Sequence, residues 1–200
     1  MDFTKVKESL EKRGFKVSVF ETAAEAAEYL NGKIDGTTVS FGGSMTLKQM
    51  GMFEKLSAHN TIYDHWNVPE GENADDIRSK AMMTETYVSS VNGLAETGEV
   101  INIDGTGNRV ASTIYGHKRL FLVVGCNKLA PTFEEAMWRA RNIAAPMNAK
   151  RLGVKTPCAV DGKCHDCNSP ACICNVISIH RHPGRGTDTE VVLINESLGF

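Results

Sequence analysis

The apolar run Leu120-Phe121-Leu122-Val123-Val124 constrains the fold of this chain more than any other feature of the sequence. Five consecutive apolar residues predict a strand covered on both faces, which is typical of a parallel sheet with helices on either side. Strand-like segments at residues 37–41 and 190–194 alternate with helical patterns such as 133–143, which is expected to end before Pro146. The sequence therefore predicts an α/β fold, an open mixed or parallel sheet flanked by helices.

The chain is expected to form one domain over residues 1–200. Its 200 residues and 42% hydrophobic content fit a single globular unit. Residues 1–34 predict a helix, a strand and a second helix, and Thr22 with Glu25 forms a capping box at the start of the second helix. The cysteine-rich residues 156–175 interrupt the alternation of strands and helices, so they are expected to be an insertion.

The charge balance argues against some classes of partner. The chain has 22 Lys and Arg against 24 Asp and Glu, a net charge of −2, which gives no global reason to expect nucleic acid. No run approaches the roughly 18 apolar residues that a membrane span requires, and residues 1–8 do not resemble a signal peptide. We therefore expect a cytoplasmic protein that binds neither nucleic acid nor membrane.

Gly42, Gly43 and Ser44 lie between a predicted strand and a predicted helix. Glycines let the backbone approach an anion closely, and a serine can cap a helix whose free N–H groups carry positive potential. The segment lacks the Gly-Lys-Ser/Thr of a Walker loop and the Gly-x-Gly-x-x-Gly of a dinucleotide fold. It predicts either an anion-binding turn or a plain turn with a serine cap.

Residues 90–98 place polar groups between two predicted strands, and Glu96 is the carboxylate of that segment. A glutamate held away from bulk water can act as a general base or nucleophile. We therefore expect Glu96 and Asn92 to face a reacting group, with a surface turn as the alternative.

Two further polar segments, residues 104–109 and 125–128, follow predicted strands. Open parallel sheets bind ligands outside the carboxyl ends of their strands, and a guanidinium can grip a carboxylate or phosphate bidentately. A hairpin or helix-start turn is the alternative for the first segment, residues 104–109. The residues expected to bind an anion are Asp104, Gly105, Gly107, Asn108, Arg109, Asn127 and Lys128.

Five of the six cysteines lie within 17 residues: Cys158, Cys164, Cys167, Cys172 and Cys174. Cysteines in a reducing cytosol seldom form static disulfides, so the clustering needs another cause. Thiolates separated by two residues in a turn can converge on a metal, and a second pair completes a tetrahedral sulfur shell. Cys164 and Cys167 form the first expected pair and Cys158 and Cys172 the second. Cys174 is a spare or replaces Cys172.

The spacing of these cysteines leaves the metal open. Structural zinc favours two evenly spaced knuckles, and the irregular spacing here matches neither common ferredoxin pattern but is compatible with a cubic iron–sulfur cluster. A redox dithiol at Cys164 and Cys167 and free structural thiols are the remaining interpretations. The sequence thus predicts zinc or an iron–sulfur cluster as the cofactor.

Four segments together resemble the LUD-domain family, also called the DUF162 or lactate utilisation protein family. They are residues 42–47, 90–109, 123–128 and 141–152. The resemblance implies the fold shared by glucosamine-6-phosphate deaminase, ribose-phosphate isomerase and CoA transferases. The segment 141–152 and the cysteines after it are similar to single-domain members of the family. The best-known multi-subunit members do not all carry the cysteine segment.

The resemblance also implies a link to bacterial L-lactate oxidation, in which related proteins act beside iron–sulfur and oxidoreductase subunits. We expect a small anionic metabolite or CoA thioester as ligand, with a metal site nearby. The alternative is a non-catalytic accessory or electron-transfer module. A third interpretation, a transferase or isomerase, rests on analogy with proteins of the same fold alone. The sequence leaves open whether the protein forms a homo-oligomer.

Overall fold

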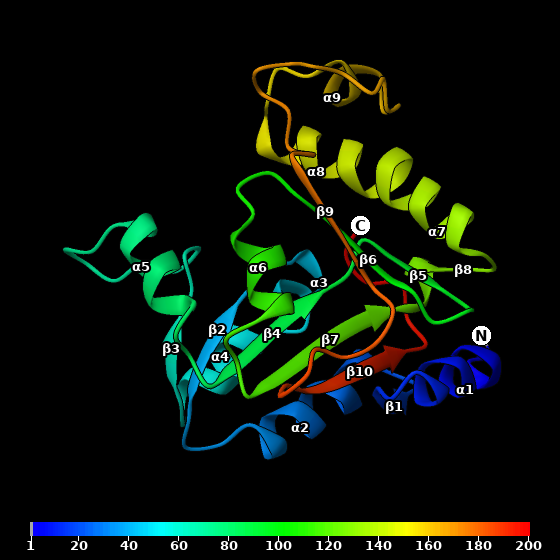
Figure 1. Cartoon of the computed structure of the whole chain (residues 1–200). Coiled ribbons are helices and arrows are strands. Elements are labelled where there is room, and N and C mark those ends of the chain that lie inside the picture. Colours follow the sequence, from blue (N-terminus) through cyan, green and yellow to red (C-terminus); the bar gives the residue numbers. More distant parts are fainter. Residues whose placement is uncertain (1) are drawn as a thin grey trace.

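The computed structural model describes residues 2–200, so Met1 of the expected N-terminal unit lies outside the described residues. A large parallel sheet, a smaller second sheet and the helices packed on them make up the molecule (Figure 1). In chain order the elements are α1 (Thr4–Lys12), β1 (Lys16–Phe20), α2 (Ala23–Lys33), β2 (Thr38–Phe41), α3 (Met45–Gln49), α4 (Met52–Ser57), β3 (Thr61–Tyr63), α5 (Ala74–Ala81), β4 (Thr86–Ser90), β5 (Gly93–Ala95), β6 (Val100–Asp104), α6 (Asn108–Ile114), β7 (Arg119–Gly125), η1 (Cys126–Lys128), β8 (Leu129–Ala130), α7 (Phe133–Arg139), η2 (Ala140–Ala144), α8 (Ala145–Leu152), α9 (Pro157–Asp161), β9 (Val176–His180) and β10 (Asp188–Ile194).

Six parallel strands form the large sheet, in the order β1-β10-β7-β4-β2-β3. The apolar strand β7 lies inside it between β10 and β4, with Leu122 opposite Val191 on one side and Ser89 on the other. Residues 120–125 of β7 are all buried. The expected open sheet flanked by helices is therefore confirmed, because a strand buried on both faces needs layers above and below it.

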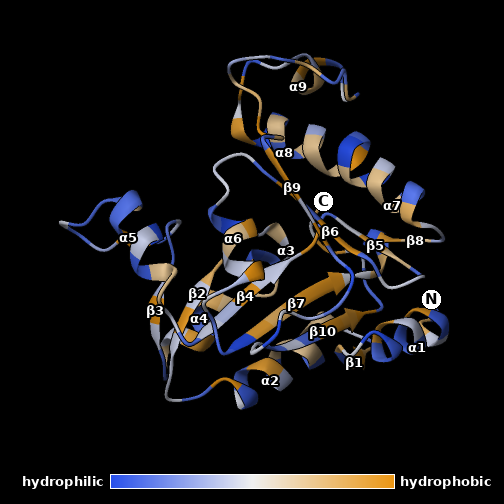
Figure 2. Ribbon diagram, viewed as in Figure 1, coloured by the Kyte–Doolittle hydropathy of each residue, from blue (hydrophilic) through white to orange (hydrophobic). Residues whose placement is uncertain are grey.

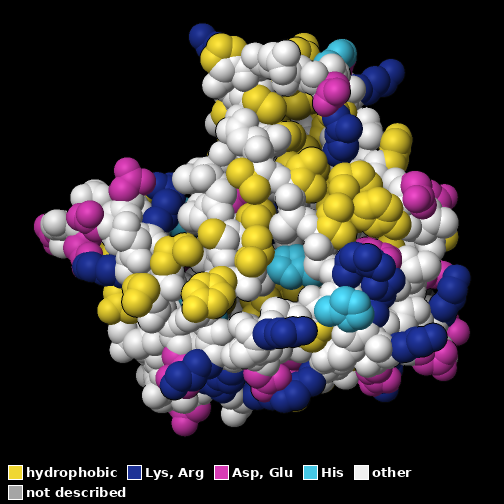
Figure 3. All heavy atoms as spheres, in the orientation of Figure 1, with side chains coloured by type: hydrophobic (Ala, Val, Ile, Leu, Met, Phe, Trp, Pro, Cys, Tyr) yellow, Lys and Arg dark blue, Asp and Glu magenta, His cyan; other side chains and the backbone are white. Residues whose placement is uncertain are grey.

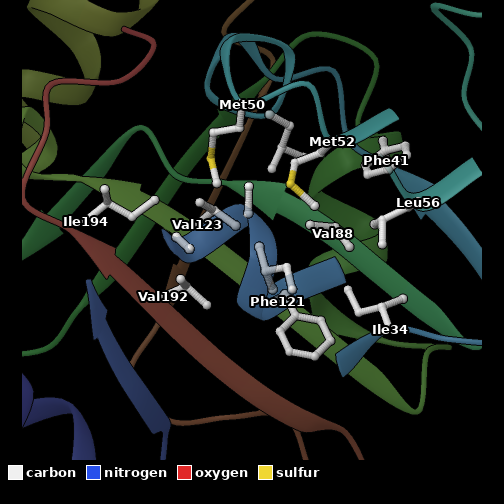
Figure 4. Close-up of a cluster of buried hydrophobic side chains, with 14 of the residues drawn as sticks. Ile34, Phe41, Met50, Met52, Leu56, Val88, Phe121, Val123, Val192 and Ile194 are labelled. Atoms are coloured by element: carbon white, nitrogen blue, oxygen red, sulfur yellow. The ribbon is translucent and has the colours of Figure 1, made fainter. Parts of the chain in front are cut away.

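One face of the large sheet packs against α2, α3 and α4 (Figure 4). Phe121, Val123 and Val192 extend from the strands, and Met50 and Leu56 meet them from the helices. Burying each of these side chains contributes about 1.5–3 kcal/mol. Figure 2 shows the apolar character concentrated on the central strands and the polar character on outlying helices such as α1 and α5.

The second sheet covers part of the other face. Its order is β8-β5-β6-β9, and Leu94 of β5 packs with Leu122 and Leu193 of the large sheet. The edge strand β9 exposes Ile177 and Ile179. Figure 3 shows hydrophobic side chains gathered on the face of the molecule that β9 crosses in Figure 1. The second sheet is therefore an intermediate layer between the large sheet and the helices α7 and α8.

A continuous helix runs from α7 through the π-helical segment η2 into α8. The prediction that the helix ends before Pro146 is wrong, because the helix continues to Leu152. A proline in a helix lacks its N–H and crowds the carbonyl four residues earlier. The wider π turn at residues 140–144 directly precedes Pro146, and its altered hydrogen-bond pattern accommodates the missing N–H within the continuous helix.

The cysteine-rich residues 156–175 connect α8 to β9 and lie beside α8, on the side of that helix away from the large sheet (Figure 1). Among them the structure assigns the short helix α9 and otherwise turns and irregular backbone. The conformation of this segment therefore depends on local contacts rather than on a sheet or a long helix.

Candidate functional site

A cavity of about 300 Å³ opens where β2 and β4 end, against the segment that follows β6. We call it the basic cavity. Gly42, Gly107 and Asn127 do not line it, although each adjoins a residue that does. Those predicted ligand-binding residues that line the basic cavity, together with Asn92, are Gly43, Ser44, Asn92, Asp104, Gly105, Asn108, Arg109 and Lys128.

Basic side chains from four separate elements meet in this cavity: Arg78, Arg109, Lys128 and Arg151. The acidic side chain that lines it is Asp104. Sequence reasoning missed Arg78 and Arg151, which come from α5 and α8. The signals that could have found them are weak: a net positive C-terminal half and the position of Arg151 inside the segment 141–152 that resembles the family.

Arg151 is held on the cavity wall by two neighbours. Its guanidinium lies over the ring of Trp66, 5.0 Å from the ring centroid, and its Nε donates to Asn148 Oδ1 at 3.0 Å. Partial burial lowers the pKa of Arg151 from its ordinary value. The Trp66 ring also covers Gly43, where a Cβ would lie 2.9 Å from a ring atom. This wall is therefore built around a glycine and an aromatic ring.

Arg109 is half-buried, and its guanidinium is committed to protein acceptors. One terminal nitrogen donates to Asn102 Oδ1 at 2.5 Å and to the Ser90 carbonyl at 3.3 Å. The other donates to Asn92 Oδ1 at 2.7 Å and to the Ile103 carbonyl at 2.6 Å. The expected bidentate grip on a ligand is thus already used inside the protein. Arg109 lends positive charge to the cavity and ties β4 to β6.

Asn92 lines the cavity as expected, and its two side-chain atoms differ. Its Oδ1 accepts from the Ile103 N–H at 2.8 Å and from Arg109, which fixes the orientation of the amide. Among residues 2–200, Asn92 Nδ2 makes no hydrogen bond to the protein, so it is a donor that a ligand can use. Asn92 is therefore suited to holding an oxygen atom of a ligand.

Gly42 lies behind the cavity, where only a hydrogen fits. A Cβ there would lie 2.6 Å from Ser89 Oγ, 2.7 Å from Tyr87 Oη and 2.8 Å from Arg109 Cγ. Ser44 caps the five-residue helix α3 by accepting from the Leu47 N–H at 3.3 Å. The glycine turn therefore serves close packing around Arg109 as well as lining the site.

Arg139 of α7 holds the backbone beside the basic cavity in place. Its Nη1 donates to the Asn92 carbonyl at 2.6 Å, and its Nε donates to the Asn127 carbonyl at 2.6 Å. Burial lowers the pKa of Arg139 to about 10. Asn127 holds the last residues of the chain instead of lining the cavity, since its Oδ1 accepts from the Leu198 N–H at 3.1 Å.

The structure does not bring Glu96 to the basic cavity. Its carboxylate accepts from Lys5 Nζ at 2.6 Å in a partly exposed ion pair, beyond the far end of β5 from Asn92. The three residues of β5 separate the two side chains by about 13 Å along the strand. Asn92 and Glu96 therefore do not face one group together.

All five clustered cysteines line a second cavity of about 190 Å³, which we call the cysteine cavity. None of them forms a disulfide. Among residues 2–200, no three His, Cys, Asp or Glu side chains are placed to hold one metal ion. The five thiols thus surround a shared space without converging on a single point within it.

Polar contacts fix several of these thiols. The Cys174 N–H donates to Cys172 Sγ at 3.4 Å, and the Arg141 guanidinium lies 3.9 Å from Cys164 Sγ while pairing with Asp166. Asp166, between Cys164 and Cys167, has a left-handed φ of 48°, a conformation that aspartate tolerates better than most residues. Burial, reinforced by the neighbouring thiols, raises the pKa of Cys174 to about 12.

The two cavities share a wall made by Ile103, Ala145 and Ile173. Ile173 lies between Cys172 and Cys174 in the chain, and a Cβ on Gly105 would lie 3.2 Å from Ile173 Cα. The close approach of these backbones favours a glycine at position 105, because a side chain there would push Ile173 aside by a few tenths of an ångström. The basic cavity and the cysteine cavity are therefore adjacent.

The fold and the site define an α/β protein with an open parallel sheet and a basic cavity at the carboxyl ends of its strands. The sequence model of the LUD domain matches residues 3–194, so the chain belongs to the LUD domain family. This membership supports a role related to lactate utilisation.

A solved structure gives the same fold. The crystal structure of a DUF162 family protein from Deinococcus radiodurans is similar with a TM-score of 0.53 and 11% sequence identity, over 97% of this chain and 98% of that one. No curated protein sequence is significantly similar to the chain. No helix among residues 2–200 has the length and apolar character to cross a membrane.

Proposed function

We propose that this protein binds a small anionic metabolite in the basic cavity and acts in lactate utilisation through that ligand. The observation that carries the proposal is the convergence of Arg78, Arg109, Lys128 and Arg151 on a cavity whose acidic side chain is Asp104. Partly buried cations attract an anion more strongly than exposed ones because water screens them less. Asn92 Nδ2 adds a directed donor.

The size of the cavity favours a small carboxylate or phosphate over an acyl-CoA. Ligand pockets usually measure about 300–1,000 Å³. A cavity of about 300 Å³ holds a short carboxylic acid completely, whereas the nucleotide part of a CoA thioester would lie outside it. A CoA ester could place only its acyl end in this site.

Thermal unfolding with L-lactate, pyruvate, inorganic phosphate or acetyl-CoA added separately tests the proposal. A ligand at 100 times its Kd stabilises the protein by about 2.7 kcal/mol, which raises Tm measurably. Arg151→Ala should weaken the response to the small anions, whereas Arg185→Ala, at an exposed loop position, should not. The proposal fails if no anion raises Tm, or if both variants respond alike.

A second candidate function concerns the cysteine cavity, for which we propose an iron–sulfur cluster with zinc as the alternative. A zinc ion needs four ligands close together, with sulfurs about 2.3 Å from the metal, whereas a cubic cluster separates its thiolates more widely. Five thiols around about 190 Å³ of shared space fit the wider arrangement better. The N–H donated to Cys172 Sγ and the charge of Arg141 would stabilise thiolate ligands.

A cluster in the cysteine cavity would let the chain exchange electrons with an oxidoreductase subunit. Metal and sulfide analysis of protein purified without oxygen tests this function. We expect several irons with sulfide per chain, visible absorption that dithionite bleaches, and loss of both in Cys164→Ser. Cys126→Ser is the matched control, because Cys126 is outside both cavities. One zinc per chain would favour a structural site, and freely titrating thiols with no metal would exclude both.

A further inference from the structure

Lys128 is a buried amine on the wall of the basic cavity. The residue is 3% exposed, and its Nζ donates to Ser90 Oγ at 2.8 Å and to Thr46 Oγ1 at 3.0 Å. Both partners are neutral hydroxyls, and within residues 2–200 no carboxylate forms an ion pair with Lys128. Lysines are rarely buried without an ion-pair partner, so this placement calls for a chemical reason.

The charged groups that face Lys128 disfavour its protonated form. Arg139 reaches it from α7 and Arg109 from α6, and both guanidiniums are fixed by hydrogen bonds to carbonyls and amides. Burial, together with the charges of Arg139 and Arg109, lowers the pKa of Lys128 to about 7. A large fraction of the amine is therefore neutral at neutral pH, and a neutral amine is a nucleophile.

The surroundings of the amine also provide a route for protons. Thr46 Oγ1 and Ser90 Oγ are 3.2 Å apart, so the two hydroxyls and Nζ form a closed set of hydrogen bonds. Ser90 and Lys128 both line the cavity, which connects this set to a bound ligand. The 3-10 turn η1 at the end of β7 positions Lys128, and the Leu198 carbonyl accepts from Thr46 at 3.3 Å.

We propose that Lys128 forms an imine with the carbonyl carbon of a 2-oxo acid bound in the basic cavity. The inference rests on the proposed anion-binding function: the basic groups select the carboxylate, and the amine selects a carbonyl beside it. The Nζ lone pair attacks the carbonyl carbon and a C–N bond forms. The carbonyl oxygen then leaves as water with the two protons of the amine, which Ser90 and Thr46 can transfer. No oxidant or reductant is needed.

Reductive trapping tests the inference. The protein is incubated with pyruvate and sodium borohydride, and the product is analysed by intact mass and peptide mapping. We expect one adduct per chain on Lys128, with the mass of pyruvic acid less one oxygen atom. Its yield should rise as the pH increases through about 7, and L-lactate, which has no carbonyl to react, should lower the yield by competition.

Variants and binding data separate the outcomes. Lys128→Met should lose the adduct. Lys118→Met removes an exposed lysine just before strand β7, at the opposite end of that strand from Lys128, and should keep the adduct. Peptide mapping of the wild-type chain decides the matter even if Lys128→Met does not fold. Anions that raise Tm without any adduct on Lys128 would overturn the imine alone. The absence of both would overturn the anion site as well, and labelling spread evenly over exposed lysines would also overturn the imine.

Discussion

The basic cavity and the cysteine cavity are adjacent, but the protein builds them in different ways. The first takes its side chains from elements as distant in the sequence as α3, β4, β6 and α8, and part-buried hydrogen bonds to β4 and β6 fix its Arg109. The second takes all its thiols from 17 residues with little regular structure. The comparison indicates that the fold itself determines the geometry of the basic cavity, whereas a bound group would complete that of the cysteine cavity.

The largest expected effect comes from removing the half-buried Arg109 guanidinium, which makes four hydrogen bonds inside the protein. Arg109→Ala should lower the free energy of unfolding by about 3–5 kcal/mol, because it leaves the acceptors of Asn92, Asn102 and two carbonyls without their donor. Urea denaturation measures the change. Arg151→Ala, on the exposed rim, should cost less than about 1 kcal/mol. Equal losses in the two variants would contradict the structural role of Arg109.

The next effect is a pH dependence caused by Lys128. Its pKa is about 7 in the folded chain and ordinarily 10.5, so the unfolded chain binds more protons between those values. The contribution of Lys128 to the unfolding free energy therefore rises with pH across this window, by up to about 5 kcal/mol.

Lys128→Met removes this contribution, so it should stabilise the protein relative to wild type near pH 7 and lose that advantage toward pH 10. Denaturation of both proteins at several pH values measures the difference. A constant difference between them would show that Lys128 is not held as a weakly basic amine.

A smaller effect is expected at the glycine turn. Gly42→Ala places a methyl group 2.6–2.8 Å from Ser89, Tyr87 and Arg109, which should cost about 2 kcal/mol. Gly32→Ala is the control. It lies in helix α2 with no neighbour near its Cβ position, and it should stabilise the protein by about 0.5–1 kcal/mol. Thermal unfolding of the two variants would then shift in opposite directions.

The smallest effect should come from the cysteine cavity. In metal-free protein, Cys164→Ser should change the free energy of unfolding by about 0.5 kcal/mol or less, because the thiol is partly exposed and the hydrogen bond that it accepts from Arg141 is 3.9 Å long. Chemical denaturation of protein treated with a chelator measures it. A loss as large as that of Arg109→Ala would show that the cysteine segment supports the fold without any bound group.

Sequence patterns predicted the structural features that depend on residues close together in the chain. The apolar run 120–124 identified a strand of the parallel sheet, and Thr22 with Glu25 formed the predicted capping box. The five neighbouring cysteines line one cavity, and the metal predicted from their spacing stays a prediction. In each case the residues that decide the structure lie within a few positions of one another.

The sequence did not predict what depends on contacts across the fold. Arg78 and Arg151 reach the basic cavity through the packing of α5 and α8, which no local pattern encodes. Arg109 was identified as a site residue. Its hydrogen bonds to internal acceptors, however, depend on how α6 packs against β4 and β6. The short strand β5 separates Glu96 from Asn92, and a polar run in the sequence does not show where such a strand begins or ends.

The position of Ile173 links the two cavities. Its side chain lines both of them, and the residue lies between Cys172 and Cys174 in the chain, against the backbone of Gly105. Any displacement of Ile173 by a group bound to these thiols would therefore alter the wall of the neighbouring chamber as well, so the two cavities share one deformable partition.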